Sequence, residues 1–492
     1  MSISLQQVSQ IGGIIAFSGF TNNGLGRSIV LNPTLPAIVF DFAPGAFVDS
    51  GAKYVMSVDI SIAEVIANGV VVGIIIGSQV QQILYPQSNL LTILTPPLWF
   101  YNVIIFGGGV CGQYGCLLNA FSSCGPWLGE YNPSNNNFNY TCMPFPSNNI
   151  ITNLFDIIID FENQNIYFIH SSSVDAGLGI FAIPFSELQN LVTNLYISSN
   201  WLFAWIEPSN APSPFYIYPG NGVLYNDVFF FSGADEYDDP WFYVVAYDEI
   251  PWAQSFPSTP TPIGTAYQLG SAKYSEMPQL FLNYIYSNGN ITPEILVYVP
   301  EFFANAGYYA DLNIYSIDPN TLNYYQLTGW VNANCTARAI YFDGTLVFPN
   351  YIEATESGIT FSVSAYVRSS NSFITSQPIQ NLLDVKVSEP GYVVTFSGSS
   401  SNMTVTIYQV LFQKTPAIVS LVYADGVLQG TVTSLNDNTP LPNAVVILFS
   451  LASQNAYSNA GTIVDSTTTD DNGNFQFQLK QAGYYGVQLV SW

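Results

Sequence analysis

The sequence predicts an all-β protein made of several tandem β-sandwich or jelly-roll domains. Short runs rich in Val, Ile, Tyr and Phe recur along the 492 residues, and Gly, Pro and Asn separate them. Runs of this length and spacing are typical of strands joined by tight turns. Only residues 184–195 have a clear helical pattern, with an apolar stripe that ends at Leu195. We therefore expect one helix lying across a sheet.

Residues 1–106 are predicted to form a jelly-roll-like base domain. The β-rich runs at 37–42, 54–62, 70–76 and 99–106 alternate with turn residues. The most apolar stretch, 67–77, is much shorter than the about 20 residues that a membrane-spanning helix needs, and it is β-branched. We expect it to be a buried strand and expect no membrane span.

Residues 107–255 are predicted to form an irregular cysteine-containing segment followed by a β domain. Four of the five cysteines lie within 32 residues, and their spacing favours local disulfides over a zinc site, which would be expected to contain a C-x-x-C pair. Four cysteines allow three connectivities, of which the simplest joins the first two and the last two. The candidates are Cys111, Cys116, Cys124 and Cys142.

The Pro-rich segment 256–262 is predicted to be a stiff linker between domains. Strand-like runs resume over 264–423, which is long enough for one large sandwich, or for two smaller ones with a split near Pro378.

The last domain, 424–492, has the clearest pattern. Residues 427–433 alternate, a turn-rich stretch follows, and 444–449 form a short apolar run. A tight turn at 470–474 then leads into 475–479, where Phe475, Phe477 and Leu479 share one face and glutamines take the other. This pattern predicts a small antiparallel sandwich with one wet face and one buried face.

The order Gly430-Thr-Val, Pro442-Asn-Ala-Val-Val and Thr469-Asp-Asp-Asn-Gly473-Asn-Phe475 resembles carboxypeptidase-regulatory-like, transthyretin-like β-sandwich modules. The resemblance covers 424–492. It implies an Ig-like or transthyretin-like fold and the role of a spacer or stalk, with no catalytic residues to carry over.

Charge is scarce and almost entirely negative. Charged residues make up 8% of the chain, against about 25% in an ordinary domain, and the net charge is −25 at pH 7. Such a surface repels nucleic acid, so we expect no nucleic-acid partner. In strong acid most carboxylates are protonated and only nine basic groups, including His170, remain charged. The composition therefore favours a protein that works in hot, acidic surroundings.

No chemical motif in the sequence is strong. The acidic run 235–239 could bind Ca²⁺, but it lacks EF-hand spacing and is better explained as a solvated loop. The single histidine, His170, has serines beside it, yet neighbours along a strand point to opposite faces, so a Ser-His-Asp triad is not expected. We expect no catalytic residues, no metal and no cofactor.

Four sequons are candidate glycosylation sites, at Asn139, Asn290, Asn334 and Asn402. Four tryptophans could stack on sugars if exposed, although core packing is the default for each: Trp201, Trp205, Trp241 and Trp252.

In composition and layout the whole chain resembles turret and spike structural proteins of viruses that infect acidophilic archaea. The absence of a positively charged leader before Arg27 fits that expectation. The resemblance implies a non-enzymatic virion glycoprotein on the particle surface that attaches to a host. Its partners would be other copies of itself (a pentamer, by analogy), other capsid proteins, and a host glycan or pilus. Two alternatives remain open: a secreted acid hydrolase of the thermopsin type, and a surface adhesin or filament subunit.

Overall fold

A computed structural model of the chain describes most of its strands together with some of their connections. The described residues are 2–20, 27–30, 47–48, 55–58, 70–76, 79–85, 91–93, 98–100, 103–110, 127–132, 135, 137–142, 152–172, 177–187, 200–210, 221–234, 239–270, 278–302, 310–330, 333, 339–342, 344–355, 358–388, 392–399, 402–451 and 462–492.

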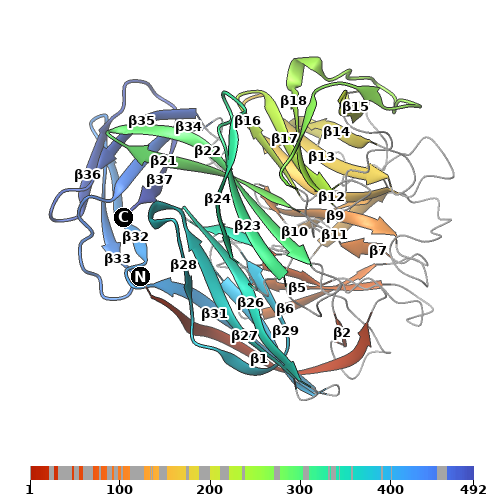
Figure 1. Cartoon of the computed structure of the whole chain (residues 1–492), viewed down its shortest axis with the longest axis horizontal. Coiled ribbons are helices and arrows are strands. Elements are labelled where there is room, and N and C mark those ends of the chain that lie inside the picture. Colours follow the sequence, from red (N-terminus) through yellow and green to blue (C-terminus); the bar gives the residue numbers. More distant parts are fainter. Residues whose placement is uncertain are drawn as a thin grey trace.

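Three sheets in the middle of the chain are antiparallel meanders whose strands follow one another in sequence (Figure 1). The first holds β12 (Thr152–Asp160), β13 (Asn165–Ser172), β14 (Leu178–Pro184) and β15 (Leu202–Glu207), extended by the parallel β19 (Thr261–Pro262). The second holds β16 (Gly222–Tyr225), β17 (Val228–Ala234), β18 (Pro240–Ala246) and β20 (Thr265–Gln268). The third holds β21 (Gln279–Ser287), β22 (Asn290–Phe302), β23 (Ala310–Ile317) and β24 (Tyr324–Trp330).

Two sheets of the same kind precede them. One holds β3 (Phe47–Val48), β4 (Val55–Val58), β5 (Val70–Ile76) and β6 (Gln79–Tyr85). The other holds β7 (Leu91–Ile93), β8 (Leu98–Phe100), β9 (Val103–Val110), β10 (Trp127–Asn132) and β11 (Asn137–Cys142). The apolar stretch at 67–77 thus contains strand β5, as its β-branched residues predict.

A nine-stranded sheet joins two further meanders through a short pairing of β27 with β29. The first of these meanders holds β25 (Ile340–Phe342), β26 (Thr345–Thr355), β27 (Gly358–Val367) and β28 (Ser372–Thr375). The second holds β29 (Ile379–Ser388), β30 (Tyr392–Ser399) and β31 (Asn402–Phe412), and its outer strand is β1 (Ile3–Phe20), with β2 (Arg27–Val30) beyond it. The N-terminal strand therefore completes the last meander, with Ile3 opposite Phe412.

Successive meanders pack face to face, and each hydrophobic core lies between two of them. One core joins the β9–β10 region to β12–β15, the next joins that sheet to β17 and β18, and a third joins β17 and β18 to β21–β23. The series continues from β22 and β23 to β26 and β27, and from there to β29–β31 and β1. Strand β29 also contacts β3, so the last meander adjoins the first.

Seven meanders of about four strands, arranged in a ring and closed by the N-terminal strand, constitute a β-propeller in the described part of the chain. The prediction of an all-β protein is confirmed. The prediction of tandem sandwich or jelly-roll domains is wrong, because the sheets of the ring do not separate into two-sheet domains. The sheets from β12 to β27 instead contribute one face to the core shared with the preceding sheet and the other face to the core shared with the following one.

The C-terminal residues form two three-stranded sheets that face each other. The first holds β32 (Pro416–Ala424), β33 (Val427–Ser434) and β36 (Asn474–Gln478), and the second holds β34 (Val445–Leu451), β35 (Thr462–Thr468) and β37 (Tyr484–Ser491). Their shared core includes Phe475 and Phe477, while residues between and beside them in β36 are exposed, as the alternation predicts. A second cluster, which includes Tyr284 and Phe449, packs this unit against the β21–β22 hairpin.

Helix is rare among the described residues. Residues 185–187 of the predicted helix are helical, and 188–199 lie outside the described ranges. Two short 3-10 helices are present, η1 (Tyr247–Glu249) and η2 (Arg368–Ser370). Within the described ranges, the structure contains no helix that is both apolar and long enough to cross a bilayer. The Pro-rich segment 256–262 lies between β18 and β20, which are strands of one sheet.

Candidate functional site

The structure describes only some of the residues predicted to form disulfides or to carry glycans. Cys111, Cys116 and Cys124 lie outside the described residues, and Cys142 is the last residue of β11. Disulfide pairing therefore stays a prediction. Of the four sequons, Asn334 lies outside the described residues, while Asn139 and Asn402 fall in β11 and β31. The fourth, Asn290, follows the turn between β21 and β22 and is exposed.

The acidic candidates that the structure describes have hydrogen-bond partners within the fold. Residues 235–238 lie outside the described ranges, and Asp239 accepts a hydrogen bond from the Gln268 amide at 2.8 Å. At the second acidic turn, the Asp470 carboxylate accepts the backbone N–H groups of Asn472 and Asn474, and these bonds lower its pKa. The described residues bring together no group of three or more metal-ligating side chains.

His170 belongs to the core. Its ring lies 4.7 Å from that of Phe181 and 5.4 Å from that of Phe256, and burial lowers the pKa of the imidazole to about 3. Directly across the sheet stands Gly179, where an added Cβ would lie 1.9 Å from the imidazole ring. Because Gly179 has no side chain, the imidazole ring of His170 can occupy this space beside the neighbouring strand.

The four tryptophans lie in the core or against it. Trp201 and Trp205 are buried, and Trp241 and Trp252 are partly buried against the core between the β12–β15 sheet and its neighbour. The large exposed aromatic residues are tyrosines instead. Two of them are adjacent at the start of β24, where Tyr324 is 39% exposed and Tyr325 is 56% exposed.

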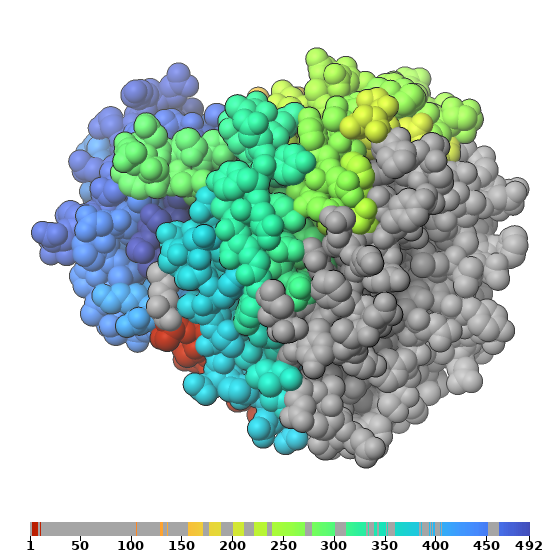
Figure 2. Space-filling view, in the orientation of Figure 1, coloured from red at the N-terminus to blue at the C-terminus, as the bar shows by residue number. Residues whose placement is uncertain are grey.

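We call the exposed residues Asn323, Tyr324, Tyr325 and Gln326 the β24 rim. Strand β24 is the outer strand of its sheet, so one of its two edges has no paired strand among the described residues. Figure 2 shows the chain around β23 and β24, in teal-green, in the middle of the visible face. Residues 321–330 carry no charged side chain. The rim therefore offers aromatic faces and an open backbone edge to solvent, together with two exposed amides whose nitrogens donate to Asn313 Oδ1 and Thr321 Oγ1.

Tyr324 is held in one orientation by residues of the preceding sheet. Its ring meets that of the buried Phe242 edge to face, with centroids 5.2 Å apart, and lies 6.0 Å from that of Tyr267. Phe242 and Tyr267 are themselves stacked at 4.8 Å. The Tyr324 hydroxyl donates a hydrogen bond to the backbone oxygen of Gln268 at 3.1 Å. The exposed ring is thus fixed before any ligand arrives.

Tyr325 projects from the opposite face of β24, as adjacent strand residues must. It lies near Arg368, and its phenol contributes to the raised pKa of that guanidinium. Arg368 follows β27 in the next meander, so the two tyrosines of the rim face the sheets on either side of their own.

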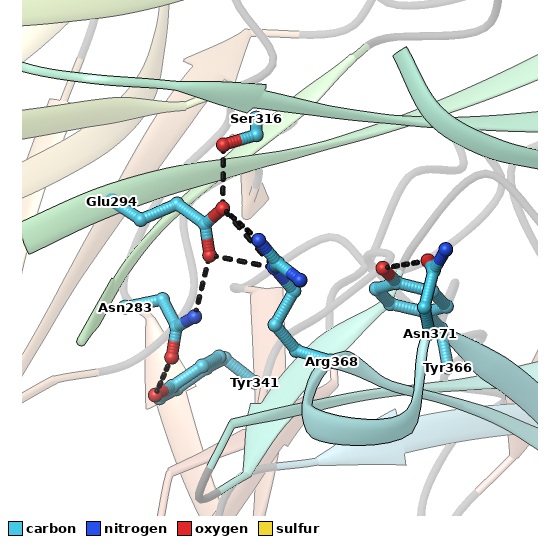
Figure 3. Close-up of polar contacts among 7 residues, drawn as sticks. All are labelled: Asn283, Glu294, Ser316, Tyr341, Tyr366, Arg368 and Asn371. Carbon is cyan, nitrogen blue, oxygen red and sulfur yellow. Dashed lines mark hydrogen bonds and ion pairs between the residues drawn. The ribbon is translucent and has the colours of Figure 1, made fainter. Parts of the chain in front are cut away.

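Arg368 belongs to a buried polar cluster centred on Glu294 of β22 (Figure 3). Arg368 Nε donates to both carboxylate oxygens, at 3.1 and 2.9 Å, and Nη2 donates to Oε1 at 2.9 Å. Ser316 Oγ donates to Oε1 at 2.5 Å and Asn283 Nδ2 donates to Oε2 at 2.8 Å. Tyr341 in turn donates to Asn283 Oδ1 at 2.9 Å.

This cluster can hold a charge pair but offers no reactive carboxylate. Burial alone would disfavour the charge on Arg368, but its hydrogen bonds to Glu294 and the charge of Glu294 outweigh that cost and raise the pKa of the guanidinium. Both oxygens of Glu294 are engaged. Two further buried carboxylates also have structural partners: Asp160 accepts from Tyr167 and from the turn at 162–163, and Asp156 accepts from the Gly222 N–H.

The β24 rim is not among the sites predicted from the sequence, where only tryptophans are candidates for stacking on sugars. The local sequence Asn323-Tyr-Tyr-Gln326 is the signal that could have predicted it. Adjacent residues of a strand point to opposite faces, so the two tyrosines cannot both enter the same core.

No protein-family model and no curated protein matches the sequence. Solved structures with a similar arrangement of strands include propeller domains and a peptidase. The WD40 domain of SCAP from fission yeast has a TM-score of 0.38 at 8% identity, over 82% of this chain and 98% of that one. The propeller domain of the Trilobed protease from Pyrococcus furiosus has 0.34 at 12%, over 70% and 92%. A puromycin-hydrolyzing peptidase from Mycobacterium tuberculosis has 0.42 at 10%, over 80% and 58%.

These comparisons correct two predictions. The expected virion component with a jelly-roll capsid domain is contradicted, because the described sheets form a propeller, and two of the structures named here are propeller domains as well. The expectation that the chain is not an enzyme is contradicted too, since one of these structures is a peptidase and another is part of a protease. At this level of similarity the chemistry of the chain rests on its own residues.

Proposed function

We propose that the β24 rim binds a neutral glycan outside the cell, in acidic surroundings. The observation that carries the proposal is the pair of adjacent exposed tyrosines on an edge strand, one of which is already fixed by Phe242, Tyr267 and a hydrogen bond to Gln268. Fixing a ring in advance removes part of the entropy that binding would otherwise cost.

The residue types of the rim suit sugars. An aromatic face packs against the apolar C–H face of a sugar ring, and amides both donate and accept hydrogen bonds with hydroxyl groups. Asn323 and Gln326 flank the two tyrosines on this strand. The absence of charge from 321–330 and the net charge of −25 favour a neutral ligand over an anionic one.

The chemistry of the rim also fits acid. Amide and phenol groups carry no charge at low pH, so protonation leaves the rim unchanged. The described residues contain a single ion pair, so the fold has few charge pairs to lose when carboxylates are protonated. We expect an acid-unfolding midpoint below about pH 3, followed by far-ultraviolet circular dichroism, and a midpoint above about pH 4 would contradict an acidic habitat.

Affinity gel electrophoresis on a mannan, a glucan and a galactan, at pH 3 and pH 6, tests the binding. We expect retardation by at least one polymer at both pH values. Tyr324→Ala and Tyr325→Ala should each weaken it by about tenfold, the loss of roughly 1.4 kcal/mol.

Tyr484→Ala is the matched control, because Tyr484 is 51% exposed but lies in the C-terminal unit. It should leave retardation unchanged. Binding that is absent from all three polymers, or that Tyr484→Ala weakens as much as the rim variants do, would refute the proposal.

A further inference from the structure

Strand β32 presents an apolar edge to solvent. It is the outer strand of its three-stranded sheet and pairs only with β33 among the described residues. Every residue from 419 to 425 is exposed. The exposed apolar side chains of this strand are Val419, Leu421, Val422 and Tyr423.

Such an edge is a template for another strand, and proteins usually protect it with charges or prolines. Between Thr415 and Ala424 the chain has no charged residue, and its one proline, Pro416, is at the buried end. A bulge at Ser420, which has a left-handed φ of 56°, is the only irregularity in the β32–β33 pairing. Serine is small enough for two such bulges to face each other.

The charges at the two ends of the strand complement each other. Lys414 precedes β32, Asp425 follows it, and both are exposed. If two identical strands align antiparallel, each Lys414 comes beside the Asp425 of the other copy. At other parts of the surface, two copies would repel each other, because each chain has a net charge of −25 and only eight Lys and Arg residues.

We propose that β32 is the contact through which two copies of this chain associate, strand against strand and antiparallel. The two-fold axis passes near Ser420, the apolar side chains on either side of it become buried, and the Lys414 and Asp425 ends pair. The two β24 rims are then carried by one dimer, although the contact does not depend on what the rims bind.

Sedimentation velocity of the full chain at pH 6, over a hundredfold range of concentration, tests this. We expect a monomer–dimer equilibrium. Val422→Lys, at a side chain that is 48% exposed, should weaken it by at least about tenfold, whereas Val464→Lys, at an equally exposed valine of β35 (52%), should not change it.

Exchanging the charges of Lys414 and Asp425 tests whether the two β32 strands align antiparallel, independently of any effect on folding. Lys414→Glu alone and Asp425→Lys alone should each weaken the dimer, and the double variant should restore it to within about threefold of the original. Thermal melting of each variant confirms that it is folded. A chain that stays monomeric, a dimer indifferent to Val422→Lys, or single variants that the exchange does not rescue would each overturn the proposal.

Discussion

Glu294 and Arg368 lie in different meanders of the ring and form the single ion pair among the described residues, with Nη2 and Oε1 2.9 Å apart. Glu294 is buried in the central part of its sheet, and Arg368 reaches it from the end of β27 in the next one. The pair and its polar cluster therefore tie together two neighbouring sheets that also share an apolar core.

Replacing Arg368 should destabilise the ring strongly. Arg368→Met leaves Glu294 buried beside Asn283 and Ser316 without its countercharge, and breaking a buried pair in this way costs about 3 kcal/mol or more. Urea unfolding at pH 7 measures the loss. The exposed Lys480 supplies the control, since Lys480→Met should change the free energy of unfolding by less than about 0.5 kcal/mol.

The double variant Glu294→Met with Arg368→Met distinguishes pairing from packing. If the cost comes from an uncompensated charge, the double variant should be more stable than Arg368→Met alone. An equal or greater loss in the double variant would mean that the shape of these side chains matters and their charge does not.

Gly179→Ala should destabilise the sheet through a clash with His170. The added Cβ would lie 1.9 Å from the imidazole ring, which cannot withdraw because Phe181 and Phe256 pack against it. We expect a loss of at least about 2 kcal/mol in urea unfolding. His170→Ala should rescue part of that loss in the double variant, and the absence of any rescue would argue against this clash.

His170 should make the fold less stable in acid. Burial lowers its pKa to about 3 from the ordinary 6.5, so between these values the unfolded chain binds a proton that the folded chain does not. The free energy of unfolding should therefore fall as pH decreases from 6.5 to 3, and His170→Phe should remove this part of the slope. Urea titrations at pH 7, 5 and 3 provide the comparison.

Glu130 should act in the opposite direction. Burial raises the pKa of its carboxyl from 4.5 to about 7, so in this range the folded state holds a proton that the unfolded state has lost. Stability should fall as pH rises from 4.5 to 7. Glu130→Gln should flatten that dependence, and an unchanged slope in the same titrations would show that the carboxyl is not buried as described.

Asn290 should be glycosylated when the chain is produced in a host that attaches N-glycans. It is exposed beside a tight turn, and Thr292, the third residue of its sequon, is exposed as well. Peptide mass spectrometry before and after deglycosylation reports occupancy, with Asn290→Gln as the control. An unmodified Asn290 in a host that glycosylates another sequon of this chain would contradict the expectation.

Local patterns predict the strands well because a strand shows its two faces within a few residues. The alternation of Phe475 and Phe477 with exposed glutamines is an example, and the structure confirms it. Alternation cannot tell a sandwich from a propeller, however, since both use half-buried antiparallel strands. What separates them is which sheet lies opposite, and residues such as Phe348 and Tyr298, in contact across two meanders, are far apart in sequence.

The candidate site depends on the same long-range information. Tyr324 is exposed yet fixed because Tyr267 and Phe242, from another sheet, lie beneath it. Nothing near Tyr324 in sequence indicates this support. Core packing, the default that the sequence predicts for the tryptophans, is confirmed for Trp201 and Trp205, because their large apolar surface favours burial.

The pairing of β1 with β31 sets the order in which the chain can fold. Ser4 donates to the backbone oxygen of Leu411, 407 residues later, so a growing chain cannot close its ring until β31 has left the ribosome. Until then the edge of β1 that pairs with β31 stays open, although β2 can already pair with its other edge, and both ends of the stack of sheets expose open edges. Contacts of such long range slow folding, so we expect closure to be the late and slow step of synthesis, and the stage most exposed to aggregation.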